Sequence, residues 1–291
     1  MAKPFVSFIV PVYNEERSIE RTVSGIHAAF RLPALRSFRY EIIAVDDGSK
    51  DHSYEKISHL PGVRALHHVR NRGYGAALKT GLLSAKGEWI FITDADATYP
   101  LEDIPRLLQE IDGFDMVVGA RTGKHVHVPL MRRPAKFFLN KLARYMTGAN
   151  IPDLNSGFRI FKKDLAMRFF AFFPEGFSFT TTITIASLTN NYRVKFIPIN
   201  YFKREGKSSI KAFRDFFGFT QLIIRLSLYF KPLNVFLPVS FVLFGVGAIK
   251  LLVDYLNVNH FGLGGVLLIL TAVQIAFLGL LADLILRRTS V

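Results

Sequence analysis

The stretch "EWIFITDADATYP", residues 88–100, indicates the fold, because a run of strand-forming apolar residues leads directly into two aspartates, Asp94 and Asp96. We expect a strand over 88–96. Alternate side chains of a strand point to the same side, so both carboxylates would face one divalent cation at the sheet edge. Mg²⁺ or Mn²⁺ bound by so few protein ligands keeps coordination positions for phosphate oxygens. Taken alone, the tripeptide Asp94-Ala95-Asp96 fits a turn or a helix cap as well as it fits a metal site.

Similar apolar runs alternate with helical patterns through the first 120 residues. Further strands are expected at 5–13, 40–47, 63–69 and 115–121. Helices are expected at 15–31, 51–59, 74–85 and 101–111. The alternation predicts an α/β fold in which helices cover both faces of a parallel sheet and ligands bind where the strands end. Asp46 and Asp47 fall at such an end, as Asp94 and Asp96 do.

The C-terminal part has a different composition. Two apolar segments, 233–253 and 261–286, are each long enough to cross the hydrocarbon core of a bilayer, which is about 30 Å thick. The link between them has no Lys or Arg, whereas basic residues flank their outer ends. The positive-inside rule therefore predicts a two-helix transmembrane hairpin with both ends, and the N-terminal domain, in the cytoplasm. The alternative is a pair of buried helices in a soluble protein.

The net charge of +14 is concentrated in two segments, 121–147 and 203–231. Their basic residues are interleaved with aromatic and aliphatic ones, which favours an anionic membrane surface over nucleic acid. We expect 211–231 to form an amphipathic helix in the headgroup plane. The segment 128–146 has similar chemistry and is expected there too, with an ordinary helix packed on the sheet as the alternative. The expected organisation is an N-terminal domain over 1–210, the juxtamembrane helix over 211–231, and the hairpin over 232–291.

Cysteine is absent, which excludes disulfides and thiolate metal sites. The histidines are not expected to bind a metal. His67 and His68 lie in a predicted strand with their side chains on opposite faces, and His125 and His127 lie in a basic loop without carboxylates. We interpret all four as structural or headgroup-contacting residues.

Five motifs follow successive strands in order: "VPVYNEE" (10–16), "VDDGSKD" (45–51), "NRGYGAALKTG" (71–81), "DADATYP" (94–100) and "GAR" (119–121). Together they resemble glycosyltransferase family 2, the inverting transferases with a GT-A, Rossmann-like nucleotide-sugar domain and a mixed, mostly parallel sheet. The resemblance covers roughly 5–210. Two further segments, "PDLNSGFRIFKKDL" (152–165) and "YFKREGKSSIK" (201–211), are similar to its polyprenyl-phosphate branch, which includes the dolichyl-phosphate mannose synthases.

The resemblance implies transfer of a sugar from a nucleotide-diphosphate sugar to an undecaprenyl or dolichyl monophosphate at the cytoplasmic membrane face. A UDP-sugar is favoured over GDP-mannose, and Mg²⁺ or Mn²⁺ is the implied cofactor, held by Asp94 and Asp96. These two and Arg204 are the implied catalytic residues. The implied nucleotide-sugar site consists of Pro11, Tyr13, Glu15, Asp46, Asp47, Lys79, Asp94, Ala95, Asp96, Arg204, Lys207 and Ser208. The candidates for the acceptor phosphate are Arg121, Arg132, Arg133 and Ser156.

Several points stay open within this resemblance. Arg132 and Arg133 have lipid headgroups as alternative partners, and Arg159 is interpreted as part of a fold-supporting ion pair or as a ligand. The chain has Asp-Ala-Asp-Ala-Thr where Asp-Ala-Asp-Leu-Gln is frequent. It also has hydroxyl residues over 177–188 where many relatives carry an acidic residue, and we expect these hydroxyls to face the sugar.

Two other functions compete with this hypothesis. A processive polysaccharide synthase of the same family would carry a Gln-x-x-Arg-Trp motif and more membrane spans, but the single tryptophan here, Trp89, lies in a predicted strand. A non-catalytic, membrane-anchored nucleotide-sugar binder or assembly subunit would not need both the aspartate pair and the basic loop. Gly262, Gly264, Gly265 and Gly279 allow close helix packing within or between chains, so the sequence leaves a homo-oligomer open.

Overall fold

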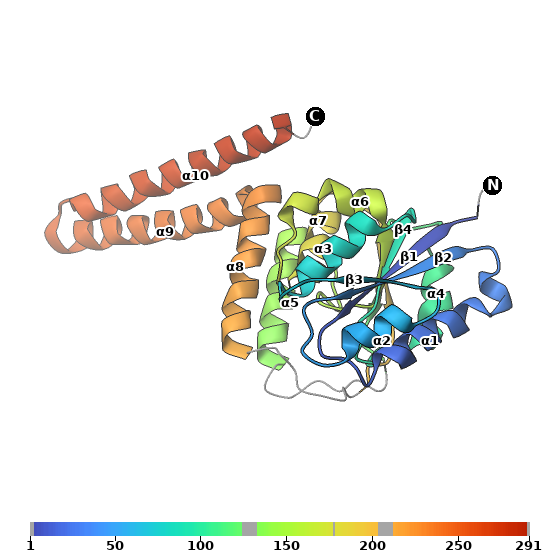
Figure 1. Ribbon diagram of the computed structural model, residues 1–291. Coiled ribbons are helices and arrows are strands. Elements are labelled where there is room, and N and C mark those ends of the chain that lie inside the picture. The colour runs from blue at the N-terminus through green and yellow to red at the C-terminus, as the bar shows by residue number, and fades with distance from the viewer. Residues whose placement is uncertain (1–2, 124–132, 177, 203–211, 290–291) are drawn as a thin grey trace. The chain divides into compact units, whose positions relative to one another are not determined.

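The computed structural model describes residues 3–123, 133–176, 178–202 and 212–289, with side chains for all of these except 133–139, 212–219, 258 and 287–289 (Figure 1). The chain divides into two compact units, Met1–Phe219 and Thr220–Val291, called the N-terminal and C-terminal units below.

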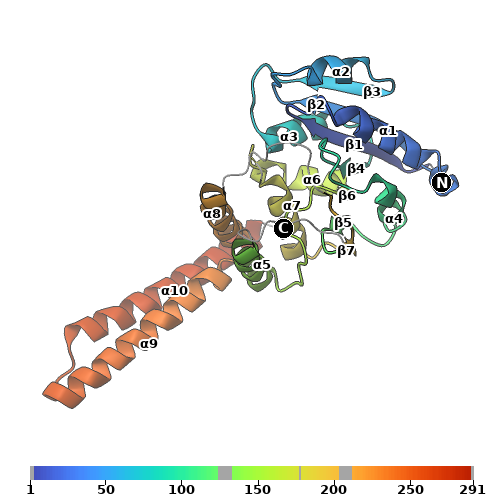
Figure 2. The same ribbon diagram turned by 90° about the horizontal axis from the view of Figure 1, so that it is seen from below.

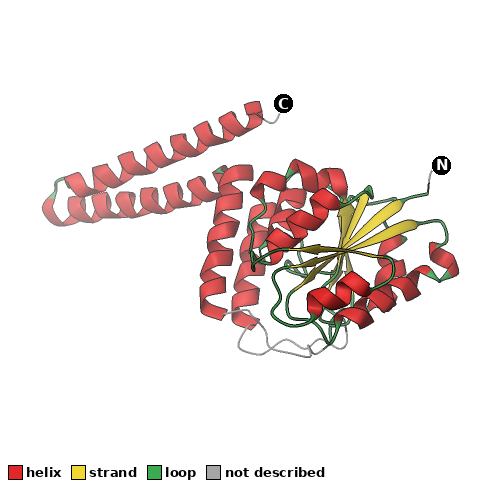
Figure 3. Ribbon diagram, viewed as in Figure 1, coloured by secondary structure: helices red, strands yellow, loops and turns green. Residues whose placement is uncertain are grey.

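The N-terminal unit is built on a seven-stranded sheet with the order β3-β2-β1-β4-β6-β5-β7 (Figure 3). The strands are β1 (Phe5–Val12), β2 (Arg39–Asp46), β3 (Val63–His67), β4 (Trp89–Ile92), β5 (Met116–Ala120), β6 (Arg159–Lys162) and β7 (Val194–Pro198). β6 is antiparallel to both of its neighbours, and every other pairing is parallel. The mixed, mostly parallel sheet is therefore confirmed.

Helices cover both faces of this sheet. They are α1 (Ile19–Phe30), α2 (Ser53–His59), α3 (Tyr74–Ser84), α4 (Ile104–Leu108), α5 (Arg133–Thr147), α6 (Lys163–Arg168) and α7 (Phe179–Thr189). Short 3₁₀ turns lie at η1 (Pro33–Leu35), η2 (Leu101–Asp103) and η4 (Phe170–Phe172). α1 and α4 lie on one face, and α3 and α7 on the other (Figure 2). The four helices expected from the sequence before residue 120 are all present, with 101–111 divided between η2 and α4.

β1 shows why the strands of this sheet are apolar on both faces. Phe8 stacks on Phe91 of β4, with ring centroids 4.7 Å apart, and belongs to the core beneath α1. Its neighbour Ile9 points to the other face, where a side chain on Gly81 of α3 would overlap it. Because both faces are covered, the strand has no solvent-facing alternation.

The expected strand over 88–96 is too long. β4 ends at Ile92, and Asp94 and Asp96 lie in the following loop, where Ala97 has a left-handed φ of 55°. Asp96 Oδ1 accepts hydrogen bonds from the backbone N–H and the hydroxyl of Thr98, and such local bonding competes with a strand ladder. The prediction that both carboxylates project from the same side of a strand is therefore wrong, although both aspartates do lie just beyond the carboxyl end of β4.

The C-terminal part contains three helices. α8 (Ala212–Phe230) includes the boundary between the units. It is followed by α9 (Leu233–Val258) and α10 (Leu263–Thr289). The expected linker over 254–260 is mostly helical, because α9 continues to Val258 and ends at Asn259, whose φ is 52°.

Within the described residues, two helical segments are long and apolar enough to cross a membrane, Leu233–Asn257 and Leu263–Leu286. Only 11% and 17% of their most apolar windows are buried, which is unlike the core helices of a soluble protein.

Small residues pack the two long helices together. Ser240 donates a hydrogen bond to the Ala272 carbonyl at 2.8 Å. A Cβ on Gly265 would be 3.1 Å from the Gly247 carbonyl, and one on Gly279 would overlap Phe236. Gly264 has open space around it. The glycines at 265 and 279 thus serve packing within the hairpin.

Candidate active site

The aspartate pair after β4 forms the centre of the candidate site. Asp94 Oδ1 accepts a hydrogen bond of 2.9 Å from the Tyr74 hydroxyl, which comes from the start of α3. Asp96 is only 7% exposed and is oriented by its two bonds from Thr98, at 3.2 and 2.6 Å. Burial, and after it the Asp94 carboxylate, raise the pKa of Tyr74 well above its usual value, so the phenol remains the donor.

The chemistry of this pair fits a hard divalent cation. Two carboxylates supply oxygen ligands, and across the described ranges no group of three or more His, Cys, Asp or Glu side chains is arranged to hold a metal. Mg²⁺ and Mn²⁺ are commonly bound by one or two carboxylates, with substrate phosphates and water completing the coordination. Asp94 and Asp96 are therefore the residues that would hold such an ion together with a diphosphate.

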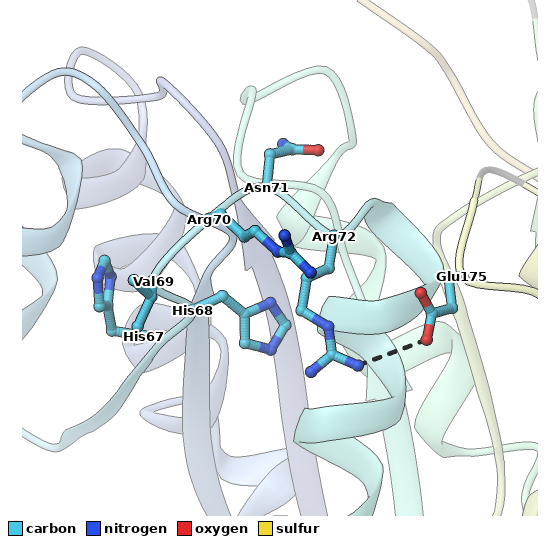
Figure 4. Close-up of a pocket in the computed structure, with 7 residues that line it drawn as sticks. All are labelled: His67, His68, Val69, Arg70, Asn71, Arg72 and Glu175. Atoms are coloured by element: carbon cyan, nitrogen blue, oxygen red, sulfur yellow. Dashed lines mark hydrogen bonds and ion pairs between the residues drawn. The ribbon is translucent and has the colours of Figure 1, made fainter.

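The second aspartate pair lies at the end of β2, and two histidines contact it. Asp46 Oδ2 is 2.9 Å from His67 Nδ1, and Asp47 Oδ1 is 2.7 Å from His68 Nδ1. β3 ends at His67, so only His67 is in a strand, and the expected alternation within a strand does not apply to His68. The two rings point in different directions from the end of β3 (Figure 4). Both histidines thus orient aspartates, which agrees with a structural interpretation.

The two aspartates of this pair are used differently. Both oxygens of Asp47 accept from the backbone, from Arg72 N at 2.9 Å and from Gly73 N at 2.7 Å. Asp46 is fully buried, and its Oδ1 has no hydrogen-bond partner among the described residues. An unpaired buried carboxylate oxygen is expensive, so Asp46 has the stronger need for a donor from a ligand. A contact of either residue with a base or ribose stays a prediction.

At the end of β1, only one of the predicted residues is well exposed. Tyr13 is 37% exposed. Glu15 is buried, and its side chain accepts a 2.8 Å hydrogen bond from Ser18 at the start of α1. Pro11 is partly buried within β1, and Ala95 is buried, with its carbonyl accepting from Thr22.

Three predicted ligands are engaged with the protein itself. The Arg121 guanidinium binds both oxygens of the buried Asp153, at 2.7 and 2.9 Å. Ser156 has no exposed surface and donates to the Gly119 carbonyl. Lys79 donates to the Phe173 carbonyl after η4 at 3.3 Å. Their proposed ligand roles stay predictions. Arg132, the Arg133 side chain, Arg204, Lys207 and Ser208 lie outside the described residues.

Arg159 supports the fold, but not through an ion pair. Its guanidinium is fully buried and donates to the carbonyls of Ser156 and Thr180 and to the hydroxyl of Thr184. None of the described carboxylates pairs with it, so the ion-pair interpretation was wrong. Burial lowers its pKa to about 10, which leaves it charged at neutral pH.

The same contacts change the interpretation of α7. Thr184 serves Arg159, and Thr181 donates to Asn155 Oδ1 at 2.7 Å. The helix is buried from Phe179 to Ser187. Thr181 and Thr184 are thus bonded inside the protein and hold α7 against the start of β6 and the loop before it, whereas Thr182 and Ser187 donate to backbone carbonyls one turn earlier, Ser178 O and Ile183 O.

An open hollow that the sequence did not indicate lies beside the second aspartate pair (Figure 4). Its volume is about 820 Å³. Arg72 and Glu175 form an exposed ion pair of 3.4 Å at its edge. It is lined by His67, His68, Val69, Arg70, Asn71, Arg72 and Glu175.

Comparison with known proteins identifies the family. Residues 7–170, more than half of the chain, match the family described as glycosyl transferase family 2. The chain belongs to glycosyltransferase family 2. Residues 231–287 match a second model, described as the GtrB C-terminal hairpin.

Two curated relatives and one solved structure illustrate the similarity. The low-salt glycan biosynthesis hexosyltransferase Agl6 of Haloferax volcanii is 27% identical, covering 95% of this chain and 68% of that protein. A dolichyl-phosphate hexose transferase from the same organism is 28% identical over 72% of this chain and 87% of its own. The glucosyl-3-phosphoglycerate synthase of Mycobacterium tuberculosis, solved with Mn²⁺, UDP and phosphoglyceric acid, has a TM-score of 0.58 at 18% identity and covers 77% of both chains. That likeness shows that the fold is GT-A-like.

Proposed function

We propose that the protein transfers a sugar from a nucleotide-diphosphate sugar to a polyprenyl monophosphate, with inversion at the anomeric carbon, at the cytoplasmic face of a membrane. One observation carries the proposal: the Asp94–Asp96 pair lies in the loop after β4 of a family 2 domain, and the same chain continues into two long apolar helices that match the GtrB hairpin. The relative named as a dolichyl-phosphate hexose transferase supports a lipid phosphate as acceptor.

For the donor we propose a UDP-sugar in preference to GDP-mannose. The M. tuberculosis synthase of similar fold was solved with UDP and Mn²⁺, which supports a uridine nucleotide and a divalent cation, Mg²⁺ or Mn²⁺. A bound cation of this kind would neutralise the developing charge on the departing diphosphate. Tyr13, at the exposed end of β1, and Asp46, whose Oδ1 has no partner among the described residues, are the described residues best suited to contact the nucleoside. Arg204 and Lys207 are proposed to close on the diphosphate.

The reaction needs little acid–base chemistry from the protein. A phosphate monoester has a second pKa near 6, so the acceptor is mostly a dianion at neutral pH. One of its oxygens forms a bond to the anomeric carbon while the bond from that carbon to the diphosphate oxygen breaks, and the nucleoside diphosphate leaves with the electron pair. A single displacement of this kind inverts the anomeric centre. The protein's contributions are orientation and charge stabilisation, which together account for most of such a rate enhancement.

Membrane orientation follows from the distribution of charge. Lys231 precedes the first span, and Arg287 and Arg288 follow the second, whereas the turn between the spans carries no Lys or Arg. We therefore place the catalytic domain and both ends of the hairpin in the cytoplasm. The basic, aromatic-rich segments 128–146 and 211–231 are proposed to lie at the membrane surface, beside a lipid-anchored acceptor.

Transfer of radiolabelled sugar tests this function directly. The detergent-purified protein is incubated with undecaprenyl or dolichyl phosphate, Mg²⁺ or Mn²⁺, and a panel of UDP- and GDP-sugars. We expect a lipid-linked product from one donor, lost on metal chelation and in Asp96→Asn, which keeps the acceptor for Thr98 but removes the charge. NMR of the product should show the anomer opposite to that of the donor. Nucleotide binding without product from any donor would instead favour a non-catalytic binder, and polymeric product would favour a polysaccharide synthase.

A further inference from the structure

Tyr74 lies between two glycines in "NRGYG", residues 71–75, and its hydroxyl donates to Asp94 Oδ1 at 2.9 Å. We propose that Tyr74 is a positioning residue for the metal site: its phenol holds the Asp94 carboxylate in the orientation in which the other oxygen binds the divalent cation. The inference rests on the proposed function, because it assumes that Asp94 and Asp96 bind the metal.

The backbone on both sides of Tyr74 is held firmly. Before it, the N–H groups of Arg72 and Gly73 donate to the two oxygens of Asp47. After it, the N–H groups of Gly75 and Ala76 donate to the carbonyls of Gly176 and Glu175, at 3.1 and 2.9 Å. A residue whose backbone is anchored in this way can hold a partner with little loss of entropy on binding.

The close contact between this loop and the backbone of residues 174–176 requires glycine at both positions. Gly73 has a φ of 105°, and a Cβ on it would be 2.5 Å from the Glu175 carbonyl oxygen. A Cβ on Gly75 would overlap the Pro174 carbonyl oxygen. Glycine-rich loops before a helix often bind phosphate through their N–H groups. Here the N–H groups of Gly75 and Ala76 are occupied by backbone carbonyls, so the loop serves to place Tyr74.

Gly157 leaves room for the Tyr74–Asp94 hydrogen bond from the opposite side. A Cβ at this position would lie 2.9 Å from Asp94 Oδ1 and 3.0 Å from the Tyr74 hydroxyl oxygen. The backbone there cannot move away easily, because Gly157 N–H donates to the Tyr99 hydroxyl at 2.7 Å. Residues from three segments distant in sequence, at 74, 94 and 157, thus define one carboxylate orientation.

The expected effect is on metal affinity. Hydrogen-bond partners of metal-binding side chains typically contribute about 10–100-fold in metal affinity or activity. The loop that carries Tyr74 is also tied to Asp47, so the nucleotide end and the metal end of the site share one anchored segment. Removing the phenol oxygen should loosen the metal end and leave the ring packing in place.

Direct measurement of Mn²⁺ binding tests the proposal. Free Mn²⁺ is followed by its EPR signal while the detergent-purified protein is titrated in the presence of UDP or GDP. We expect Tyr74→Phe to raise the Kd for Mn²⁺ by about tenfold. Tyr40→Phe is the matched control, since it removes the phenol of a β2 residue that is 2.8 Å from His27 Nδ1 of α1, and its Kd should equal that of the wild type. In turnover, Tyr74→Phe should need more Mn²⁺ for half-maximal rate but approach the wild-type kcat at saturation.

The outcomes separate this inference from the proposed function. A wild-type protein that binds no Mn²⁺ with either nucleotide, or an Asp96→Asn variant that still binds it normally, would contradict the metal site and with it the inference. Normal Mn²⁺ binding by the wild type together with a Kd within twofold in Tyr74→Phe overturns the inference alone. If Tyr74→Phe does not fold, Gly157→Ala decides, because it keeps the phenol and crowds the same hydrogen bond. The inference then requires a raised Kd, and an unchanged Kd refutes it.

Discussion

The ion pair between Arg121 and Asp153 makes the sharpest prediction about stability. The Asp153 carboxylate is fully buried, the Arg121 side chain is 18% exposed, and the guanidinium binds both carboxylate oxygens. Burial by itself would lower the pKa of Arg121, but the charge and hydrogen bonds of Asp153, together with Tyr99 and Tyr201, outweigh it and hold the pKa well above its usual value. Replacing Arg121 by glutamine breaks this two-bond ion pair with a buried carboxylate, and breaking a buried pair typically costs about 3–5 kcal/mol.

We take the lower value, about 3 kcal/mol, because the arginine is partly exposed. For a domain of roughly 150–250 residues, each kcal/mol shifts Tm by about 2–4 °C, so Arg121→Gln should unfold about 6–12 °C below the wild type. Trp89, the single tryptophan, lies buried in β4 and reports the transition by its fluorescence. Arg106→Gln removes an exposed ion pair with Asp103 and should change stability by less than about 0.5 kcal/mol.

A double-mutant cycle completes the test. Asp153→Asn should also destabilise, and the double variant should be more stable than the sum of the single effects predicts, with a coupling of about 1–3 kcal/mol. Equal Tm values for Arg121→Gln and Arg106→Gln, or strict additivity in the cycle, would refute the reasoning. Assayed well below its midpoint temperature, Arg121→Gln also tests the predicted acceptor role, since the loss of a residue that binds the acceptor phosphate would raise KM for the polyprenyl phosphate.

Three further predictions concern the N-terminal unit. Gly81→Ala should lower the free energy of unfolding by about 1–3 kcal/mol, because the new methyl group overlaps the buried Ile9. Gly113→Ala, at an open position, should not lower it. Equal effects of the two variants in thermal unfolding would refute the packing argument. Arg159→Lys should lower Tm by several degrees, since an ammonium group cannot reach the carbonyls of Ser156 and Thr180 and the Thr184 hydroxyl together. An unchanged Tm would show that the guanidinium group is not needed for stability. Burial raises the pKa of Asp115, but hydrogen bonds from Lys162 and the Arg193 backbone outweigh it and hold the pKa below its usual value. The stability that Asp115 contributes is thus present above its unfolded pKa of about 4 and is lost as pH falls through the folded pKa. Asp115→Asn should therefore lose less stability on acidification than the wild type does. An identical dependence of stability on pH in the two proteins would contradict this.

Much of the architecture was predictable because it depends on local periodicity. Five of the seven strands, the helices between them and the two long apolar helices each have a residue pattern that repeats over a few positions. The position of Asp94 and Asp96 at a strand end was predictable for the same reason. The length of that strand was not, because the Asp96 to Thr98 hydrogen bonds end it before the aspartates.

The remaining features depend on contacts between residues far apart in sequence. β6 is four residues long and has too few positions to show a period, and its antiparallel place between β4 and β5 follows from pairing alone. The sequence left Arg159 open between an ion pair and a ligand, because the carbonyls that its guanidinium contacts carry no side-chain signature in the sequence.

The sequence by itself determined the α/β domain, the helical hairpin and the motifs of glycosyltransferase family 2, because backbone geometry and membrane thickness impose periods and lengths that a single chain displays. Only the tertiary structure decided which side chains meet: Tyr74 with Asp94, Arg121 with Asp153, and His67 and His68 with Asp46 and Asp47. Such pairs are set by how strands and helices pack, and packing brings together residues that no local pattern relates.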